Sequence, residues 1–367
     1  EGEGEGGYVP GAIAAEFKQL LKTFVRGEAQ SVDPTALYNV IKTHPTGQLY
    51  CDGGQHDCQE IMRLLMNSLH EDLKSADQLT VEDPDEKGIS EREKADRAWR
   101  AYLAEDRSPI TDLFCGQLQS RVTCHRCETV CTTYEPFWDL SIPINKEFIA
   151  RKGVQQRLGL AAHELSLEDC LRAFTADEIL EGGEGFMCPK CNEVTTATKR
   201  LRIHRFPNTL MVHLKRFKSG KISVTKIREF VAYPAADLRL HSFATEESGC
   251  AKGRATYDLV GQCLHAGSMA AGHYTSICRV EEPGGGDSAA WHLFNDERVT
   301  GLDDTRLVSP SAYVLLYSLR PPEDGAAGKA RRRAARARLH RGSASSTSTI
   351  LSRLSGGLAR LSGSSLR

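Results

Sequence analysis

Two side chains near the C-terminal end, His273 in "AGHYTSICRV" and Asn295 in "WHLFNDERV", are of the right types to work together in hydrolysis. The Gly-rich stretch between them can reverse the chain between two strand-like runs. A hairpin folded about Gly284 places His273 opposite Asn295, because each lies eleven residues from the bend. An imidazole held by a carboxamide is the general base and its orienting group in a Cys-His-Asn hydrolase. The pair therefore predicts thiol hydrolase chemistry, but no cysteine lies in an obvious nucleophile motif.

Two CxxC pairs predict a metal site. Cys124 and Cys127 form one pair, Cys188 and Cys191 the other, and sixty residues lie between the pairs. Each pair makes a tight knuckle, and four thiolates complete the tetrahedral set that structural zinc prefers. The alternative is a redox CxxC, which normally opens a helix, whereas both pairs here follow strand-like or loop sequence. We expect zinc to join the ends of two long β-ribbons without doing chemistry, because no coordination position stays open.

The first third of the chain is predicted to be helical. Asp57 and Glu60 have capping-box spacing ahead of an apolar run, and Ser90 and Glu93 repeat that spacing before Trp99. An earlier helix is indicated by apolar residues at helical spacing, namely Ile13, Phe17, Leu20, Leu21 and Phe24.

Short runs rich in β-branched and aromatic residues begin at about Leu113 and continue to "AYVLLYSL". A predicted helical insert, "SLEDCLRAFTADEIL", interrupts them. Helices followed by a largely antiparallel sheet indicate the α+β class.

Composition indicates an intracellular globular protein. Hydrophobic residues make up 40% and charged residues 26% of the 367 positions, and no apolar run approaches the roughly 20 residues that span a bilayer. The opening "EGEGEGG" has no secretory pattern, so we expect a cytoplasmic or nuclear protein. Twelve cysteines in such a compartment should stay reduced or bind metal.

The charge is unevenly distributed. Residues 325–367 hold ten Lys or Arg and no acid, so the preceding part has 37 basic and 48 acidic groups, a net charge of −11. An acidic body favours a basic protein partner over nucleic acid. The Arg/Ser/Gly-rich segment 321–367 is predicted to be a disordered tail, because it cannot bury enough apolar surface to fold.

Several segments together resemble the ubiquitin-specific proteases, which are papain-like cysteine hydrolases. The resemblance runs in order from about Gly53 to Leu319, and it rests on "GGQHDCQEIMRLLMNSLHEDL", "LFCGQLQSRVTCHRC", "PFWDLSIPI", "FMCPKCN", "RFPNTLMVHLKRF", "YDLVGQCLHAGSMAAGHYTSICR", "WHLFNDERV" and "SAYVLLYSL". It implies a thumb–palm–fingers architecture with a helical N-terminal part, an antiparallel sheet and zinc-bearing β fingers.

The resemblance also implies a role for individual residues. His273 matches the general base, Asn295 the residue that orients it, and Asp296 a position that assists the catalytic centre. The four CxxC cysteines match the zinc ligands. The groove for the ubiquitin tail would be lined by Gln55, Asp57, Glu60, Gly272 and Tyr274. Carboxylates there would pair with the arginines of that tail, and simple helix capping is the alternative role for Asp57 and Glu60.

The family's nucleophile box, of the form GLxNxGNTCYxN, has no counterpart in this chain. No cysteine precedes Cys51, and Cys58, Cys263 and Cys278 are poor substitutes because acidic neighbours or strand positions disfavour a thiolate. We therefore expect the chain as given to be N-terminally truncated, or else to be a truly inactive relative. Either way, we expect it to have no peptidase activity by itself.

The predicted function is that of a thiol-dependent deubiquitinase, which hydrolyses isopeptide bonds at the C-terminus of ubiquitin. Residues 8–320 would form the truncated catalytic domain, with a helical thumb part (8–112) and the palm and fingers (113–320). Expected partners are ubiquitin and ubiquitinated proteins, with no membrane span, no nucleic acid on the folded domain and a monomeric state. The alternatives are an inactive ubiquitin-binding module and a zinc-dependent structural module unrelated to ubiquitin.

Overall fold

The computed structural model describes most of the chain between residues 9 and 321. The described residues are 9–26, 32–74, 88–144, 148, 154, 158, 164–219, 224–248, 255–268, 271–281 and 289–321. The predicted bend around Gly284 lies outside them, as does the tail after residue 321.

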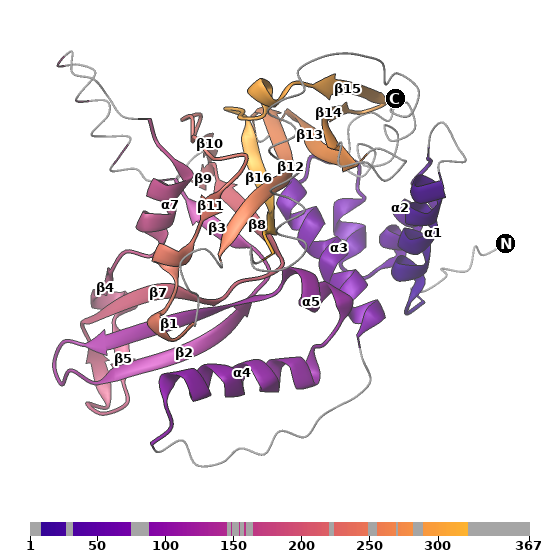
Figure 1. Ribbon diagram of the computed structural model, residues 1–367. Helices are drawn as coiled ribbons and strands as arrows, with labels where there is room; N and C mark the ends of the chain where they lie inside the picture. The colour runs from indigo at the N-terminus through magenta and orange to yellow at the C-terminus, as the bar shows by residue number, and fades with distance from the viewer. Residues whose placement is uncertain are drawn as a thin grey trace.

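Helices α1, α2, α3 and α5 gather at one side of the molecule, whereas α4 runs along the fingers and α7 lies on the other side of the strands (Figure 1). The α-helices are α1 (Ala12–Arg26), α2 (Thr35–Thr43), α3 (Cys58–Leu73), α4 (Glu91–Glu105), α5 (Pro109–Phe114) and α7 (Leu167–Phe174). Short 3-10 turns are η1 (Gly47–Tyr50), η2 (Gly182–Glu184), η3 (His241–Phe243), η4 (Glu246–Ser248) and η5 (Asp304–Arg306). The predicted insert is a helix only to Phe174, and its last three residues form a strand instead.

The predicted helix starts are found with small differences. Ser90 caps α4 by accepting from the backbone N–H of Glu93. Asp57 caps α3, but its side chain accepts from Gln59, one residue earlier than a capping box requires. Both caps provide an acceptor for backbone donors that have no partner inside the helix.

A four-stranded finger sheet extends away from α1, α2 and α3, in the order β2-β1-β7-β4 (Figure 1). Its strands are β1 (Gly116–Cys124), β2 (Val130–Phe137), β4 (Glu178–Leu180) and β7 (Ala197–Arg205). The small hairpin of β5 (Phe186–Cys188) and β6 (Glu193–Thr195) lies at its tip. Helix α4 packs along this sheet, where Glu91 accepts from the Tyr134 hydroxyl of β2.

The central sheet has eight strands, of which seven follow the order β15-β14-β13-β12-β16-β8-β3 while β11 pairs with β12. The strands are β3 (Leu140–Pro143), β8 (Thr209–Lys215), β11 (Leu238–Arg239), β12 (Thr256–Gly267), β13 (Gly272–Glu281), β14 (Ala289–Asn295), β15 (Arg298–Leu302) and β16 (Ala312–Leu319). A separate hairpin is formed by β9 (Phe217–Ser219) and β10 (Val224–Lys226). Within the described residues, only β3 and β8 pair in parallel, so the predicted α+β class with a largely antiparallel sheet is confirmed.

Three apolar clusters hold these parts together. The largest packs α7 and the loops after β8 against the central sheet, with Leu140, Ile142 and Tyr257 almost fully buried. A second cluster, which includes Cys58 and Tyr313, joins α3 and α5 to the central sheet. A third joins α1, α2 and α3. The helices and the sheet therefore share a continuous packed interface.

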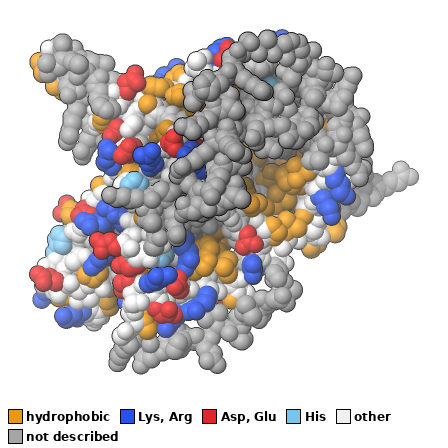
Figure 2. All heavy atoms as spheres, in the orientation of Figure 1, with side chains coloured by type: hydrophobic (Ala, Val, Ile, Leu, Met, Phe, Trp, Pro, Cys, Tyr) orange, Lys and Arg blue, Asp and Glu red, His pale blue; other side chains and the backbone are white. Residues whose placement is uncertain are grey.

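The surface differs between the two ends of the molecule. In Figure 2 acidic and basic side chains are interspersed over the fingers, whereas hydrophobic side chains gather toward the helices. Leu21, one of the apolar residues that indicated α1, is 45% exposed. Among the described residues, none of the helices combines the length and the apolar character needed to cross a lipid bilayer.

Candidate functional site: a His–Asn pair and a four-cysteine cluster

His273 and Asn295 lie side by side at one edge of the central sheet. His273 is the second residue of β13, and Asn295 is the last residue of β14. Nε2 of His273 lies 2.7 Å from Oδ1 of Asn295. Because Oδ1 can only accept, Nε2 must carry the proton. The lone pair of Nδ1 is therefore free to take a proton from another group.

The strand register that brings this pair together differs from the predicted one. Folding about Gly284 would place His292 opposite Ser276, whereas the structure pairs His292 with Cys278. The shift is two residues, and side chains alternate faces with a period of two. His273 and Asn295 therefore remain on one face, as diagonal neighbours rather than direct partners.

Asp296 lies in the tight turn between β14 and β15. Its φ is 50°, a left-handed conformation that Asp tolerates better than most residues. One carboxylate oxygen lies 3.7 Å from Nε2 of His273, beyond hydrogen-bond distance. Asp296 thus contributes negative charge beside the ring, while Asn295 makes the hydrogen bond.

Gln55 and Gly272 connect the helical part to the His273 strand. The Gly272 N–H donates to Oε1 of Gln55 over 3.4 Å. A Cβ at Gly272 would lie 2.1 Å from Nε2 of His265, so no larger residue fits there without moving that ring. The two predicted groove residues are therefore in contact, next to the proposed base.

Asp57 and Glu60 differ in what they contact. One Asp57 oxygen accepts from the Gln59 N–H at 2.8 Å, and the other accepts from the hydroxyl of Tyr313. Asp57 thus fastens α3 to β16. Glu60 is exposed and borders a groove of about 550 Å³ with Tyr50. Burial and the Glu60 carboxylate raise the pKa of Tyr50. Of Asp57 and Glu60, only Glu60 is exposed.

Tyr274 points to the opposite face from His273, into the cluster between α3 and the sheet. Its ring lies 4.7 Å from that of His265, and it packs beside Cys58. Burial raises its pKa far above the usual value for tyrosine. The structure therefore places Tyr274 in the packing between α3 and the central sheet, with the residue half-buried.

Acidification should destabilise the protein through His265. Burial, with help from the nearby Lys226 ammonium, lowers the pKa of His265 to about 4, while Asp57 opposes the shift. In the unfolded chain the His265 imidazole is protonated below about pH 6.5, whereas in the folded protein it stays neutral until about pH 4. The folded state is therefore destabilised relative to the unfolded state as the pH falls through that window. We expect the free energy of unfolding to drop by about 2 kcal/mol between pH 7 and 4.5 from this residue.

Urea unfolding at several pH values measures this loss. The pKa values of His204 and His213 are also lowered by burial, so some acid sensitivity will remain when His265 is replaced. His265→Gln should flatten the profile, whereas His241→Gln, a change at a half-buried surface position, should leave it unchanged. An unaltered pH profile in His265→Gln would contradict the prediction.

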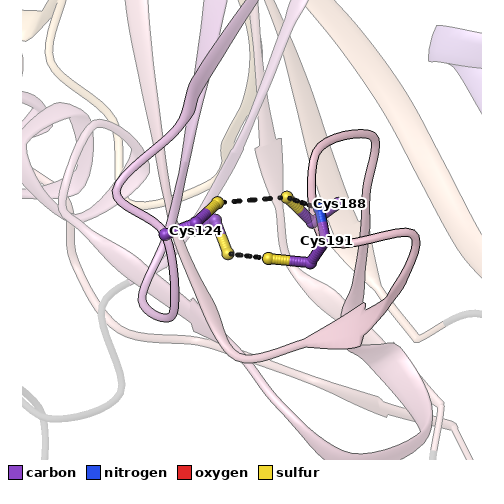
Figure 3. A group of neighbouring side chains, drawn as sticks. Cys124, Cys188 and Cys191 are labelled. Atoms are coloured by element: carbon purple, nitrogen blue, oxygen red, sulfur yellow. Dashed lines mark hydrogen bonds between the residues drawn. The ribbon is translucent and has the colours of Figure 1, made fainter.

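The four predicted metal-ligating sulfurs converge at the fingertip (Figure 3). The Sγ atoms of Cys124, Cys127, Cys188 and Cys191 all lie within 4.8 Å of one another. Cys127 lies 3.6 Å from Cys188, and Cys124 lies 4.0 Å from Cys191. A tetrahedron of sulfurs about 2.3 Å from a central ion has edges of about 3.8 Å. The cluster therefore fits a tetrahedral metal ion.

The two CxxC knuckles have the same backbone conformation and the same backbone hydrogen bond. In each, the residue after the second cysteine is left-handed: Glu128 has φ 57° and Asn192 has φ 56°. Its N–H donates to the carbonyl of the first cysteine, over 3.0 Å at Glu128 and 2.8 Å at Asn192. The first knuckle ends a long ribbon, as predicted, but the second connects strands of only three residues each.

Polar neighbours orient the sulfurs. Thr195 and Thr129 each place a hydroxyl 3.2 Å from a sulfur, on Cys124 and Cys127 respectively. The Thr195 hydroxyl and the Cys127 N–H lower the pKa of Cys124 to about 6. His125, which lies within the first CxxC pair, bonds the Thr198 hydroxyl at 2.7 Å, and Cys131 is not among the convergent sulfurs.

A second group of metal-ligand types, formed by His70, Glu71 and Asp106, has another explanation. The Lys74 ammonium lies 2.5 Å from the Asp106 carboxylate, and Nδ1 of His70 lies 2.8 Å from the Ser108 hydroxyl. The Lys74 ammonium thus supplies the positive charge beside Asp106 that a metal ion would otherwise supply. These residues close the C-terminal end of α3 against α5.

Several residues of the site were not predicted from the sequence. Tyr313 holds Asp57, Thr129 and Thr195 support the sulfurs, and His265 fills the space beside Gly272. The contacts of Tyr313 and Thr195 join segments that are far apart in the sequence, so no local sequence pattern indicates them. Thr129 lies two residues after Cys127, at the end of the first knuckle.

Comparison with known proteins places the chain among hydrolases. The family model described as ubiquitin carboxyl-terminal hydrolase matches residues 3–317. Human Ubiquitin carboxyl-terminal hydrolase 2 is 34% identical over 313 residues, which cover 85% of this chain and 48% of that protein. The chicken protein of the same name is 34% identical, over 85% of this chain and 81% of its own length. Human Ubiquitin carboxyl-terminal hydrolase 21 is 33% identical, over 79% of this chain and 50% of that protein.

Solved structures show the same fold. The yeast SAGA DUBm superposes with a TM-score of 0.55 at 23% identity, over 86% of this chain and 64% of that chain. A SAGA DUB module bound to monoubiquitin gives a TM-score of 0.56 at 21% identity, with the same coverage. The chain thus spans about half the length of its human relatives. It belongs to the ubiquitin carboxyl-terminal hydrolase family.

Proposed function

We propose that this chain provides the base, the tail groove and the fingers of a thiol-dependent deubiquitinase, which hydrolyses isopeptide bonds at the C-terminus of ubiquitin. The observation that carries the proposal is the 2.7 Å contact from Nε2 of His273 to Oδ1 of Asn295. Family membership supports the reaction class. Residues 8–320 form the catalytic domain in this proposal, with residues 8–112 as the helical thumb part and 113–320 as palm and fingers. Residues 321–367 form a basic tail.

His273 acts through Nδ1. A cysteine thiol placed there gives its proton to Nδ1 and attacks the carbonyl carbon of the terminal glycine of ubiquitin. The imidazolium then donates this proton to the departing lysine amine, and a water attacks the thioester while Nδ1 again accepts a proton. Asn295 keeps Nε2 protonated throughout, and Asp296 adds negative charge 3.7 Å away, which stabilises the imidazolium.

The ubiquitin tail would lie across the contact between Gln55 and Gly272 and would reach Glu60. Gly272 lacks a side chain, so a peptide can approach the β13 backbone closely. Glu60 can pair with an arginine of the tail, whereas Asp57 positions α3 through Tyr313. Tyr274 contributes packing beneath this groove.

The four-cysteine cluster would hold a structural zinc ion. Its donors are four sulfurs with spacings of 3.6 and 4.0 Å, and the bound ion would fasten the β5–β6 hairpin to the end of β1. Partners in this proposal are ubiquitin and ubiquitinated proteins, bound by a monomer in the cytoplasm or nucleus. The eleven described cysteines are all unpaired by disulfides, which suits a reducing compartment.

A non-catalytic ubiquitin-binding module is the second candidate, and one observation favours it. Among the described residues, no cysteine sulfur is hydrogen-bonded to His273, and Cys250 is the only cysteine outside them. In this case the groove and fingers would bind ubiquitin without cleaving it.

Residues 1–367 should bind ubiquitin and should not hydrolyse a fluorogenic ubiquitin amide. Calorimetry measures binding, and Glu60→Gln should weaken it about 3- to 5-fold, as expected for one partly exposed ion pair. Glu105→Gln makes the same change at an exposed position of α4 and should have no effect.

Turnover is the result in this assay that would decide between the two candidates. Turnover that a single cysteine substitution abolishes would establish the enzyme and show that the nucleophile lies within residues 1–367. Binding without turnover, and without labelling by an electrophilic ubiquitin probe, fits the proposed His–Asn half-site and the binding module alike. Absence of ubiquitin binding would overturn both.

A further inference from the structure

Two cysteines from distant parts of the chain lie against each other between α3 and the central sheet. Cys58 is the first residue of α3, and Cys263 lies within β12, 205 residues further along. Their Sγ atoms are 3.4 Å apart. A disulfide needs about 2 Å, so a combined movement of about 1.4 Å would join them.

Contacts on both sides hold this pair in place. Asp57, next to Cys58, accepts from the hydroxyl of Tyr313 in β16, the strand that pairs with β12. One turn further along α3, Arg63 donates to Asp139 over 2.6 Å. The first turn of α3 therefore cannot move away from β12 without breaking these contacts, and the two sulfurs stay within reach of each other.

We propose that Cys58 and Cys263 form a reversible disulfide when the protein meets a peroxide, which crosslinks α3 to the central sheet. The Cys263 thiol reacts first with hydrogen peroxide to give a sulfenic acid and water. The Cys58 thiol then attacks that sulfur, so that the S–S bond forms and a second water leaves. The peroxide is reduced, and the two thiols are oxidised by two electrons in total.

The surroundings of the two thiols favour this order. Cys58 is 9% exposed, whereas Cys263 is half-buried and more open to a small oxidant. The hydrogen bond to Cys263, followed by burial, raises the pKa of Cys58, so this thiol keeps its proton. Cys58 is thus the less reactive of the two thiols toward peroxide, and its Sγ, 3.4 Å from that of Cys263, is within reach of the sulfenic acid once that has formed.

The crosslink would fix the wall of the proposed groove. It spans the same interface as the contact between Gln55 and Gly272, because Gln55 precedes Cys58 by three residues and β13 pairs with β12. Formation of the disulfide depends only on the two thiols and on the packing of α3 against the central sheet, which brings them together. It is therefore independent of the proposed function.

Mass spectrometry of zinc-loaded residues 1–367 treated with hydrogen peroxide tests the proposal. Trypsin should release a disulfide-linked pair of peptides, 43–63 and 255–279, which dithiothreitol separates. Each peptide contains a second cysteine, Cys51 and Cys278. The crosslink should therefore disappear in Cys58→Ser and in Cys263→Ser, and it should persist in Cys51→Ser and Cys278→Ser.

Thermal unfolding gives a second measurement. Closing a loop of 205 residues should raise the Tm of the oxidised protein by roughly 5 °C or more, and dithiothreitol should reverse the rise. Persistence of the crosslink in Cys58→Ser or Cys263→Ser would overturn the proposal. So would oxidation of these cysteines to oxygenated forms without a crosslink in folded protein.

Discussion

Replacement of Cys188 by serine should reduce the bound zinc from about one ion per chain to nearly none. A serine hydroxyl is a poor ligand beside three thiolates, and Cys188 is fully buried in the cluster, where no other group can replace it. The β5–β6 hairpin has strands of only three residues. It should therefore lose its structure together with the ion, because structural zinc contributes about 10 kcal/mol or more to small folded units.

Elemental analysis of the purified protein measures the zinc, and limited trypsin digestion measures the hairpin. Cleavage after Lys190 should become faster by at least tenfold in Cys188→Ser, as local opening grows. Chelation of the wild-type protein should have the same effect.

Cys131→Ser is the matched control. Cys131 lies close enough to the cluster for its pKa to be raised, first by burial and then by the neighbouring sulfurs, but it is not one of the four convergent residues. Its replacement should leave the zinc content unchanged. Loss of zinc in Cys131→Ser, or full zinc in Cys188→Ser, would show that the ligand set is wrong.

The features predicted correctly from the sequence depend on short-range geometry. Within each CxxC pair the spacing alone makes both sulfurs converge, whatever the sixty intervening residues do. His273 and Asn295 are neighbours, as predicted, although the predicted strand register differs from the observed one by two residues. An even shift keeps both side chains on the same face of the sheet. An odd shift would have separated them.

Several contacts between distant segments were not predicted. The end of the predicted helical insert, Glu178–Leu180, pairs with β7 instead, so tertiary pairing overrides local propensity. The Asp57–Tyr313 hydrogen bond and the Cys58–Cys263 contact both require α3 to lie on the central sheet. Nothing in the sequence near Asp57 indicates that packing.

Arg216 is the clearest case of a residue that only the structure explains, and its loss should have a large effect on stability. Arg216 is fully buried, and its guanidinium donates to three backbone carbonyls. Nε donates to Ala312 over 2.6 Å, and Nη1 donates to Ile227 and Glu229 over 3.1 and 2.8 Å. Burial lowers the pKa of Arg216, so the charge is held by carbonyl dipoles.

Arg216→Met should lower the free energy of unfolding by about 3–5 kcal/mol. The methionine keeps much of the apolar bulk but leaves three carbonyls without these donors, that of Ala312 buried and those of Ile227 and Glu229 partly buried, at a cost of about 1–3 kcal/mol for each one that water cannot reach. Those carbonyls belong to the start of β16 and to the segment after β10. Without Arg216, the start of β16 and the segment after β10 would no longer be joined through one side chain. Tyr313, which follows Ala312 and donates a hydrogen bond to Asp57, would then be less firmly positioned.

Denaturant unfolding measures the change, with Lys215→Met as the control. Lys215 is the adjacent residue and is exposed, so its replacement removes the same charge without leaving a buried acceptor. It should change the stability by less than about 0.5 kcal/mol. Equal stability of the two variants would mean that water can enter and satisfy the three carbonyls. In that case the guanidinium would not be what joins β16 to the segment after β10.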